Sequence, residues 1–309
     1  MNQDPKVSVC MITYGHEKFI EQAINGVLMQ ECYFEVELII ANDCSPDKTD
    51  EVVKNILENH PRASWIKYTK HNENLGMMPN FIFALQQCKG EFIAVCEGDD
   101  YWTDPLKLQK QVDFMDHNSE YAICWTKFSI VDESEKSQFV QEPVWVEQLN
   151  ERNNVDLDLH SIFTPYCTYT LTVLFRRQSL DISLFNKLKY AKDNSLYAIC
   201  LGKGKGALLN FYSSVYRLHQ GGVYSSVSKF SKNYYSYLNL NEIVEKIPYC
   251  NNLNIRNIRN HLLSESIKTH PNHLSFQYLY LTCEGFIFLG IKKNLVLLIH
   301  NIKKIKFGK

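Results

Sequence analysis

The sequence predicts an α/β protein built on a mostly parallel β-sheet, and three observations carry this prediction. Short apolar runs alternate with segments whose apolar residues recur every three or four positions, the patterns of strands and amphipathic helices. The strand-like runs are apolar throughout, which is typical of strands buried on both faces of a parallel sheet. Polar clusters follow three of these runs directly, at the edge where such sheets bind ligands.

The elements of the first 131 residues follow one another in a regular order. Apolar runs predict strands at residues 7–13, 36–41, 65–68, 92–96 and 121–131. Apolar residues at helical spacing predict helices at residues 19–28, 49–57, 81–85 and 106–117. Helices between parallel strands imply right-handed crossovers, so the strands should form one sheet.

The pattern changes after residue 131. Residues 133–160 form a charged stretch that we interpret as a loop, followed by a β-rich run at 169–176 and a helix at 194–201. Extended structure is predicted again at 207–215, and helices from about residue 230 onward. We therefore predict one large domain, 1–228, with halves 1–131 and 132–228, and a helical extension, 229–309.

Composition excludes several classes of function. Lys and Arg total 33 against 34 Asp and Glu, so nothing global indicates nucleic acid binding. The ten cysteines stand singly with no Cys-x-x-Cys pair, which argues against zinc and thioredoxin chemistry and favours a reducing compartment. The sequence opens without a signal pattern, and no apolar run reaches the roughly 20 residues that span a bilayer. We expect a cytoplasmic protein.

The acidic cluster Glu97-Gly98-Asp99-Asp100 is the sharpest candidate site. Adjacent carboxylates at the end of a buried strand repel each other unless a cation or an array of donors offsets them. Oxygen ligands favour Mg²⁺ or Mn²⁺, and such a cation can neutralise a diphosphate leaving group. The alternative is an acidic turn that begins the helix after Asp104-Pro105.

Three further polar sites leave alternatives open. Asp43, after the second strand, can accept the imide N–H of a uracil or thymine ring, or it can make an Asx-turn. Asp193 precedes an apolar helical run and can be a general base or a helix cap. His219, in Tyr216-Arg217-Leu218-His219, can complete a metal site or be a solvated loop histidine, while Arg217 can face phosphate.

Four pieces in this order resemble glycosyltransferase family 2, whose members are inverting enzymes of GT-A fold. The resemblance runs from residue 7 to about 226 and is strongest over 7–131. It rests on the first strand and its turn (8–16), the turn Asn42-Asp43-Cys44-Ser45-Pro46-Asp47, the loop Asn74-Leu75-Gly76, and the Asp-x-Asp-type motif Glu97-Gly98-Asp99-Asp100. The segment that follows this motif resembles the same segment of bacterial family members, in Tyr101-Trp102 and in Asp104-Pro105-Leu106-Lys107-Leu108.

The resemblance implies a fold, an activity and a set of site residues. It implies a GT-A fold, that of nucleotide-diphospho-sugar transferases. It also implies transfer of a sugar from a nucleotide-sugar, which we expect to be UDP-linked, to a hydroxyl of a saccharide or lipid-linked saccharide. The expected role is cell-surface polysaccharide synthesis. The implied nucleotide-binding residues are Thr13, Tyr14, His16, Asp43, Asn74 and Asp99, the metal ligands for Mn²⁺ or Mg²⁺ are Asp100 and His219, and the catalytic base is Asp193.

Two positions depart from the family pattern. Glu97 stands where the first aspartate is usual, so its carboxylate has a longer reach. Lys192 precedes Asp193 where an acidic residue or glycine is common, and a neighbouring cation is expected to lower the pKa of that aspartate and weaken it as a base.

Two alternatives concern the tail and the activity. Residues 281–309 mix apolar side chains with lysines, so this segment is expected either to lie peripherally on the anionic inner face of a membrane or to pack on the catalytic domain. A catalytically silent nucleotide-binding scaffold is the main alternative to an enzyme. A nucleotidyltransferase should show a Gly-rich, basic loop after the first strand, and a Rossmann dehydrogenase should show G-x-G-x-x-G there. This sequence has neither motif at that position, which disfavours both classes.

Overall fold

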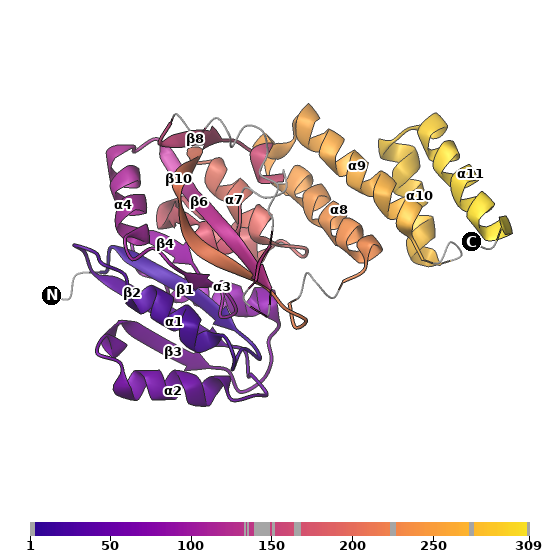
Figure 1. The fold of residues 1–309 in the computed structure, drawn as a ribbon. Helices are drawn as coiled ribbons and strands as arrows, with labels where there is room; N and C mark the ends of the chain where they lie inside the picture. The colour runs from indigo at the N-terminus through magenta and orange to yellow at the C-terminus, as the bar shows by residue number, and fades with distance from the viewer. Residues whose placement is uncertain are drawn as a thin grey trace. The chain divides into compact units, whose positions relative to one another are not determined.

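The chain forms two compact units in the computed structural model (Figure 1). The structure describes residues 4–132, 134, 136–138, 149, 152–163, 168–222, 227–271 and 275–307, with the side chains of the last helix given to residue 298 and at Asn301. The first unit contains Met1–Lys187 and Leu196–His219, and the second contains Leu188–Ser195 and Gln220–Lys309. The division runs through one helix, α7 (Asp193–Leu201). The predicted boundary at residue 228 stays a prediction.

The first unit is built on a 10-stranded sheet with the order β3-β2-β1-β4-β9-β6-β10-β5, to which β7 and β8 add at β6 and β10. The long pairings, β1 with β2 and β6 with β10, are parallel, whereas the antiparallel pairings are short. The predicted α/β class with a mostly parallel sheet is confirmed. The strands are β1 (Val7–Thr13), β2 (Val36–Asn42), β3 (Ile66–Lys70), β4 (Phe92–Val95), β5 (Tyr101–Trp102), β6 (Tyr121–Asp132), β7 (Ser137–Gln138), β8 (Asn154–Leu157), β9 (Leu174–Arg176) and β10 (Lys205–Leu218).

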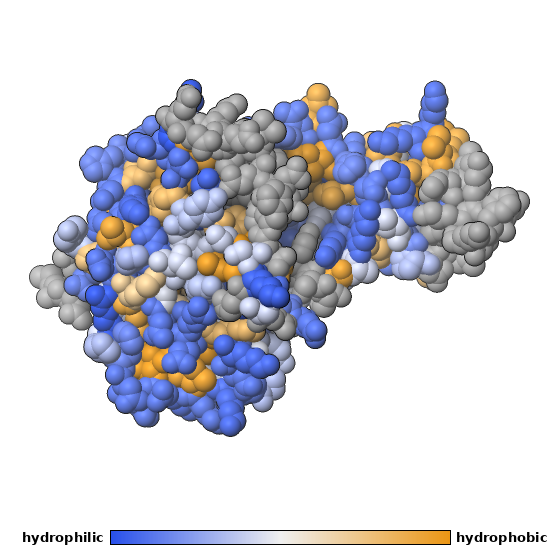
Figure 2. Space-filling view, viewed as in Figure 1, coloured by the Kyte–Doolittle hydropathy of each residue, from blue (hydrophilic) through white to orange (hydrophobic). Residues whose placement is uncertain are grey.

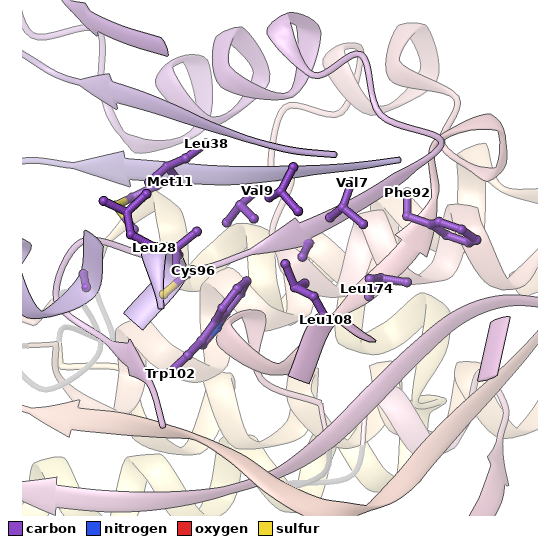
Figure 3. Packing of buried hydrophobic residues seen from close by; sticks show 14 of the residues in the cluster. Val7, Val9, Met11, Leu28, Leu38, Phe92, Cys96, Trp102, Leu108 and Leu174 are labelled. Atoms are coloured by element: carbon purple, nitrogen blue, oxygen red, sulfur yellow. The ribbon is translucent and has the colours of Figure 1, made fainter. Parts of the chain in front are cut away.

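Helices cover both faces of this sheet. Alternate residues of β1 (Val7, Val9 and Met11) point into one large core, which also takes side chains from α1 (Ile20–Leu28), α2 (Thr49–Asn59) and α4 (Lys107–His117) (Figure 3). Strand side chains alternate between faces, so Cys10 points to the other face, where α3 (Met77–Gln87) packs on β1 and β2. Both faces of β1 are therefore buried, which explains its uninterrupted apolar sequence.

Two local contacts fix the elements beside the predicted ligand edge. Oδ1 of Asp47 accepts the N–H of Thr49 at 3.1 Å and so satisfies a free backbone donor at the start of α2. A Cβ at Gly26 of α1 would meet backbone atoms of Trp102 at 2.9 Å, because β5 crosses the helix at that point. This close crossing requires glycine and sets the direction in which the chain leaves the acidic cluster at residues 97–100.

Five parts of the first unit differ from the prediction. β7 and β8 lie within the stretch interpreted as a loop, and β5 and the helix α6 (Ile182–Asn186) were not predicted. The β-rich run at 169–176 forms a 3-10 turn, Thr170–Thr172, before the short strand β9. These elements are too short for their sequences to show a period, and tertiary contacts determine their conformation.

The second unit is helical, as predicted for the residues from about 230 onward. Its long helices are α8 (Lys229–Lys246), α9 (Leu253–Thr269), α10 (Phe276–Phe288) and α11 (Ile291–Phe307). Tyr237, Leu263, Ile267, Leu281 and Leu297 meet in its core, so α10 and α11 pack on α9 within this unit. No helix of the described residues is long and apolar enough to cross a membrane.

Candidate active site

Three polar turns meet where β1, β2 and β4 end. The strands are parallel neighbours, with Thr13 of β1 paired to Asn42 of β2 and Cys10 paired to Val95 of β4. The turns are joined directly: Asp43 donates its N–H to the carbonyl of Thr13 at 2.9 Å, and Gly98 donates to the carbonyl of Ile12 at 3.0 Å. This is the edge at which open α/β sheets bind ligands.

The first turn carries Thr13, Tyr14 and His16. Thr13 Oγ1 lies 3.2 Å from Nδ1 of His16, which turns the histidine toward the acidic cluster. Gly15 between them has a φ of 73° and donates its N–H to Ser45 Oγ at 3.0 Å. Tyr14 is 49% exposed at the rim. Burial lowers the pKa of His16, with the nearby Asp99 carboxylate acting against it, which favours a neutral ring.

Asp43 in the second turn holds a loop in place. Its Oδ1 accepts the N–H of Leu75 at 2.7 Å, and its Oδ2 accepts the N–H of Gly76 at 2.9 Å. Asn74 donates from Nδ2 to the carbonyl of Asp43 at 3.3 Å. The turn after β2 and the Asn74-Leu75-Gly76 loop are therefore one bonded assembly, in which both oxygens of Asp43 already accept hydrogen bonds. A base contact by Asp43 stays a prediction.

Asp100 is the least satisfied carboxylate of the site. It is 1% exposed, and Oδ1 accepts the N–H of Arg217 at 2.9 Å. Oδ2 is buried with no hydrogen-bond partner among the described residues. Burial raises the pKa of Asp100 well above its usual range, and the charges of Asp99 and Glu97 raise it further. A buried acceptor beside two like charges suits a cation, which satisfies the oxygen and offsets the repulsion.

Asp99 is bound by two histidines. Its Oδ2 lies 3.1 Å from Nε2 of His219 and 3.7 Å from Nε2 of His16. Burial raises the pKa of Asp99, but the hydrogen bond from His219 and the nearby imidazoles outweigh it and hold the pKa below its usual value. His219 thus contacts the acidic cluster by its hydrogen bond to Asp99. Among the described residues, no three or more His, Cys, Asp or Glu side chains are arranged so that they could hold a metal ion. The assignment of His219 as a metal ligand therefore stays a prediction.

Arg217 ties the acidic cluster to α1. Its guanidinium donates to the carbonyl of Asp99 at 3.1 Å and to Gln22 Oε1 at 2.6 Å. It lies between two aromatic rings, 4.8 Å from the centroid of Phe19 and 4.9 Å from that of Tyr101. Arg217 is buried and positions the backbone of Asp99. That it faces phosphate stays a prediction.

A set of aromatic rings flanks the acidic cluster. Tyr169 lies 4.2 Å from Phe128 and 5.0 Å from Tyr216, measured between ring centroids. Thr170, next in the chain, donates its hydroxyl to Glu97 Oε2 at 2.7 Å. Burial raises the pKa of the Tyr216 phenol, and the charges of Asp100 and Glu97 raise it further, so this ring lies near the carboxylates. We call Phe128, Tyr169 and Tyr216 the aromatic wall; sequence analysis missed it.

Gly98 makes the cluster compact. A Cβ at this position would meet Thr13 Oγ1 at 2.7 Å and Nδ1 of His16 at 3.0 Å. The first turn and the acidic cluster can therefore approach this closely only if residue 98 has no side chain.

Asp193 belongs to the second unit and begins α7. Its Oδ1 accepts the N–H of Asn194 at 2.9 Å. Burial raises the pKa of Asp193 and outweighs both this hydrogen bond and the opposing charge of Lys192, whose Nζ donates to Ser236 Oγ at 3.2 Å. Lys192 lowers this pKa as expected, but burial is the larger effect, so the pKa of Asp193 lies above its usual value and the expected weakening of the base does not follow.

The sequence matches a family model and several curated relatives. The model of Glycosyl transferase family 2 matches residues 8–181, more than half of the chain. An uncharacterized protein of Mycobacterium tuberculosis is 32% identical over 223 residues, which cover 71% of this chain and 61% of that protein. Putative teichuronic acid biosynthesis glycosyltransferase TuaG of Bacillus subtilis is 26% identical over 234 residues, covering 75% and 86%. The chain thus spans less than two thirds of the length of the mycobacterial relative.

Solved structures share the fold. TarS 1-349 of S. aureus in complex with UDP-GlcNAc superposes with a TM-score of 0.64 at 20% identity, covering 94% of this chain and 83% of that one. The mannosyltransferase PcManGT of Pyrobaculum calidifontis, in complex with GDP-Man and Mn²⁺, gives a TM-score of 0.55 at 14% identity, covering 100% and 89%. The predicted GT-A fold is confirmed.

Proposed function

Because this chain belongs to glycosyl transferase family 2, we propose that it transfers a sugar from a nucleotide-sugar, UDP-linked, to a hydroxyl of a saccharide or lipid-linked saccharide. The observation that carries the proposal is the buried Oδ2 of Asp100, without a partner among the described residues and surrounded by carboxylates where the parallel strands end. The names of TuaG and of the UDP-GlcNAc complex support a UDP-linked donor and a role in cell-surface polysaccharide synthesis.

Asp100 is the residue that we propose holds Mn²⁺ or Mg²⁺, with His219 as a second ligand. The fit rests on the donor chemistry, since hard divalent cations take carboxylate oxygens and Asp100 Oδ2 is a buried acceptor without a donor among the described residues. When bound, such a cation supplies neutralising charge to the departing diphosphate. Rotation of His219 away from Asp99 would free its Nε2, which now bonds that carboxylate.

We propose that the other predicted site residues of the first unit bind and orient the nucleotide-sugar donor. At the turns after β1 and β2, the proposed nucleotide contacts are Thr13, Tyr14, His16 and Asp43. Asn74 adds a contact from the loop after β3, and Asp99 accepts a hydrogen bond from the ribose. Arg217 holds the backbone of Asp99 in place by donating a hydrogen bond to its carbonyl. The aromatic wall offers ring faces to the C–H groups of the transferred sugar, in the way that aromatic side chains and a few polar groups line sites for small ligands.

Asp193 is the proposed general base of an inverting displacement. Its carboxylate takes the proton of the acceptor hydroxyl while that oxygen forms a bond to the anomeric carbon and the bond to the nucleoside diphosphate breaks. Attack opposite the leaving group inverts the anomeric centre. The pKa raised by burial makes Asp193 a better base than an exposed aspartate, because a base works best when its pKa approaches the working pH.

A panel of nucleotide-sugars tests the proposal. Thermal unfolding is measured with each nucleotide-sugar, with and without Mn²⁺, because a ligand that binds only the folded protein raises its apparent stability. We expect a stabilisation that needs both the metal and the nucleotide-sugar, together with release of nucleoside diphosphate when an acceptor extract is added. Binding without any transfer to a broad set of acceptors favours a silent nucleotide-binding scaffold, and no metal-dependent binding contradicts the donor site.

A further inference from the structure

Helix α10 has one buried face and one exposed apolar face. Tyr278, Leu281 and Gly285 are buried in the second unit. The opposite side chains recur at helical spacing and are exposed: Phe276 is 92% exposed, Leu279 58%, Tyr280 46%, Phe286 42% and Ile287 71%. No charged residue interrupts this exposed stripe, since the only charged residue of α10, Glu284, accepts a hydrogen bond from Tyr237.

The exposed stripe continues onto the first turns of α11. Ile291 is 68% exposed, Leu295 46% and Val296 61%, while Asn294 and Leu297 are buried on the other side of the helix. Figure 2 shows hydrophobic surface where α10 ends and α11 begins. We define the α10–α11 apolar face as Phe276, Leu279, Tyr280, Phe286, Ile287, Ile291, Leu295 and Val296. Monomeric proteins rarely expose so many large apolar side chains together without a partner.

Basic charge adjoins this face. Lys292 and Lys293 are exposed beside Ile291, and no aspartate or glutamate follows Glu284 in the sequence. The other lysines after that point are Lys303, Lys304, Lys306 and Lys309. The whole chain has a net charge of −1, so positive charge is concentrated in this segment.

The combination of apolar surface and lysines identifies the partner by its chemistry. An anionic lipid surface takes apolar side chains into its acyl boundary and attracts lysines at the headgroup level. A second copy of the chain would bring the same lysines against each other across an isologous interface, which is unfavourable. No helix of the described residues is suited to cross a bilayer.

We propose that the α10–α11 apolar face, with Lys292 and Lys293, binds the surface of an anionic phospholipid membrane. The helices lie along the surface with Phe276, Ile287 and Ile291 inserted among the lipids and the lysines at the phosphates. This binding does not rest on the transferase function, because every residue involved belongs to the second unit.

Co-sedimentation of the full chain with vesicles tests this proposal. Vesicles of phosphatidylcholine with phosphatidylglycerol are compared with vesicles of phosphatidylcholine alone. We expect strong partition only into the anionic vesicles. Lys292→Gln with Lys293→Gln should weaken it about 20- to 30-fold, as expected when two basic residues are lost. Ile287→Ser with Ile291→Ser should weaken binding to a similar or greater extent, because both side chains are more than half exposed on the apolar face.

Matched controls separate this surface from general effects. Lys89→Gln with Lys203→Gln removes two exposed lysines elsewhere, and Tyr33→Ser removes a tyrosine that is 99% exposed in the first unit. These controls should leave partition unchanged, and all variants should keep the wild-type thermal unfolding curve and nucleotide binding. Equal binding to neutral and anionic vesicles, no binding at all, or a lipid-free dimer that the Ile287/Ile291 variant dissociates would each overturn the proposal.

Discussion

Glu37 and Asp100 are buried carboxylates of the same sheet with opposite surroundings. Glu37, 4% exposed at the start of β2, accepts hydrogen bonds from Ser8 Oγ, Lys67 Nζ and the N–H of Lys89. Asp100, 1% exposed and beyond the end of β4, accepts one from the N–H of Arg217. Burial raises the pKa of both, but the donors around Glu37 outweigh it and lower that pKa, whereas Asp99 and Glu97 raise the pKa of Asp100 further.

The difference separates structure from function within one sheet. At the amino ends of β1 and β2, the chain supplies every donor that a buried carboxylate needs, so Glu37 stabilises the fold by itself. At the carboxyl ends the chain brings three carboxylates together and leaves one oxygen without a donor among the described residues. A buried polar group of this kind requires an explanation, and a bound cation is the explanation that the surrounding charges favour.

Asp100→Asn tests the comparison with the largest expected effect. The amide keeps the shape but removes the negative charge that attracts a divalent cation, so metal-dependent transfer should fall by about 10³-fold or more. Thermal stability without metal should stay equal or rise, because a buried charge beside two like charges is gone. Initial rates across a Mn²⁺ titration and metal-free melting curves measure both. If Asp100→Asn transfers sugar at the wild-type rate, the proposed metal site is contradicted. If the variant is much less stable than wild type without metal, Asp100 has a structural role like that of Glu37.

Asp193→Asn tests the proposed general base separately from donor binding. Losing the proton acceptor should reduce transfer by about 10²- to 10⁴-fold, the usual contribution of a general base. The affinity for nucleotide-sugar and Mn²⁺ should not change, because the donor residues are in the first unit. Isothermal titration and single-turnover transfer give the two values, with Asn194→Ala as a control for the neighbouring position. Full transfer by the variant removes the assignment.

Tyr216→Ala tests the aromatic wall, with a smaller expected effect. Loss of one ring face should raise the KM for the nucleotide-sugar by about 2- to 10-fold, from the roughly 0.5–1.5 kcal/mol that aromatic contacts contribute. The affinity for the free nucleoside diphosphate should be unchanged, since that ligand has no sugar to contact the ring. Tyr216→Phe keeps the ring and should behave as wild type. If affinity for the free diphosphate also falls in Tyr216→Ala, the ring supports the acidic cluster instead.

The same comparison explains how much the sequence could predict. β1 agrees with the prediction to the residue, and β2 runs one residue beyond it, because both are long apolar runs ended by turn residues. The acidic cluster was found because its polar letters follow such a run directly. Local sequence patterns could identify these elements since their signal lies within about ten residues.

The partners of the acidic cluster could not be predicted in this way. Thr170 and Arg217 reach Glu97 and Asp99 from far along the chain, and nothing in their local sequence indicates which carboxylate they contact. The sequence shows that Lys192 lowers the pKa of Asp193, but it does not show the burial that raises this pKa by more. Long-range contacts and desolvation arise only in the folded chain.

Glu37→Gln is the counterpart of the Asp100 substitution and should leave the rate of transfer per folded molecule unchanged. Loss of the charged acceptor should destabilise the protein by about 1–2 kcal/mol, the usual effect of removing a hydrogen bond to a charged group. Because folding lowers the pKa of Glu37 below its usual 4.5, its contribution is present above that pH and is lost as the pH falls through the folded value. The difference in melting temperature between wild type and Glu37→Gln should therefore stay constant from about pH 6 to 8, at the value that corresponds to a destabilisation of about 1–2 kcal/mol. It should shrink below about pH 4.5. A difference in melting temperature that grows on acidification would mean that folding raises the pKa of Glu37, as burial raises that of Asp100.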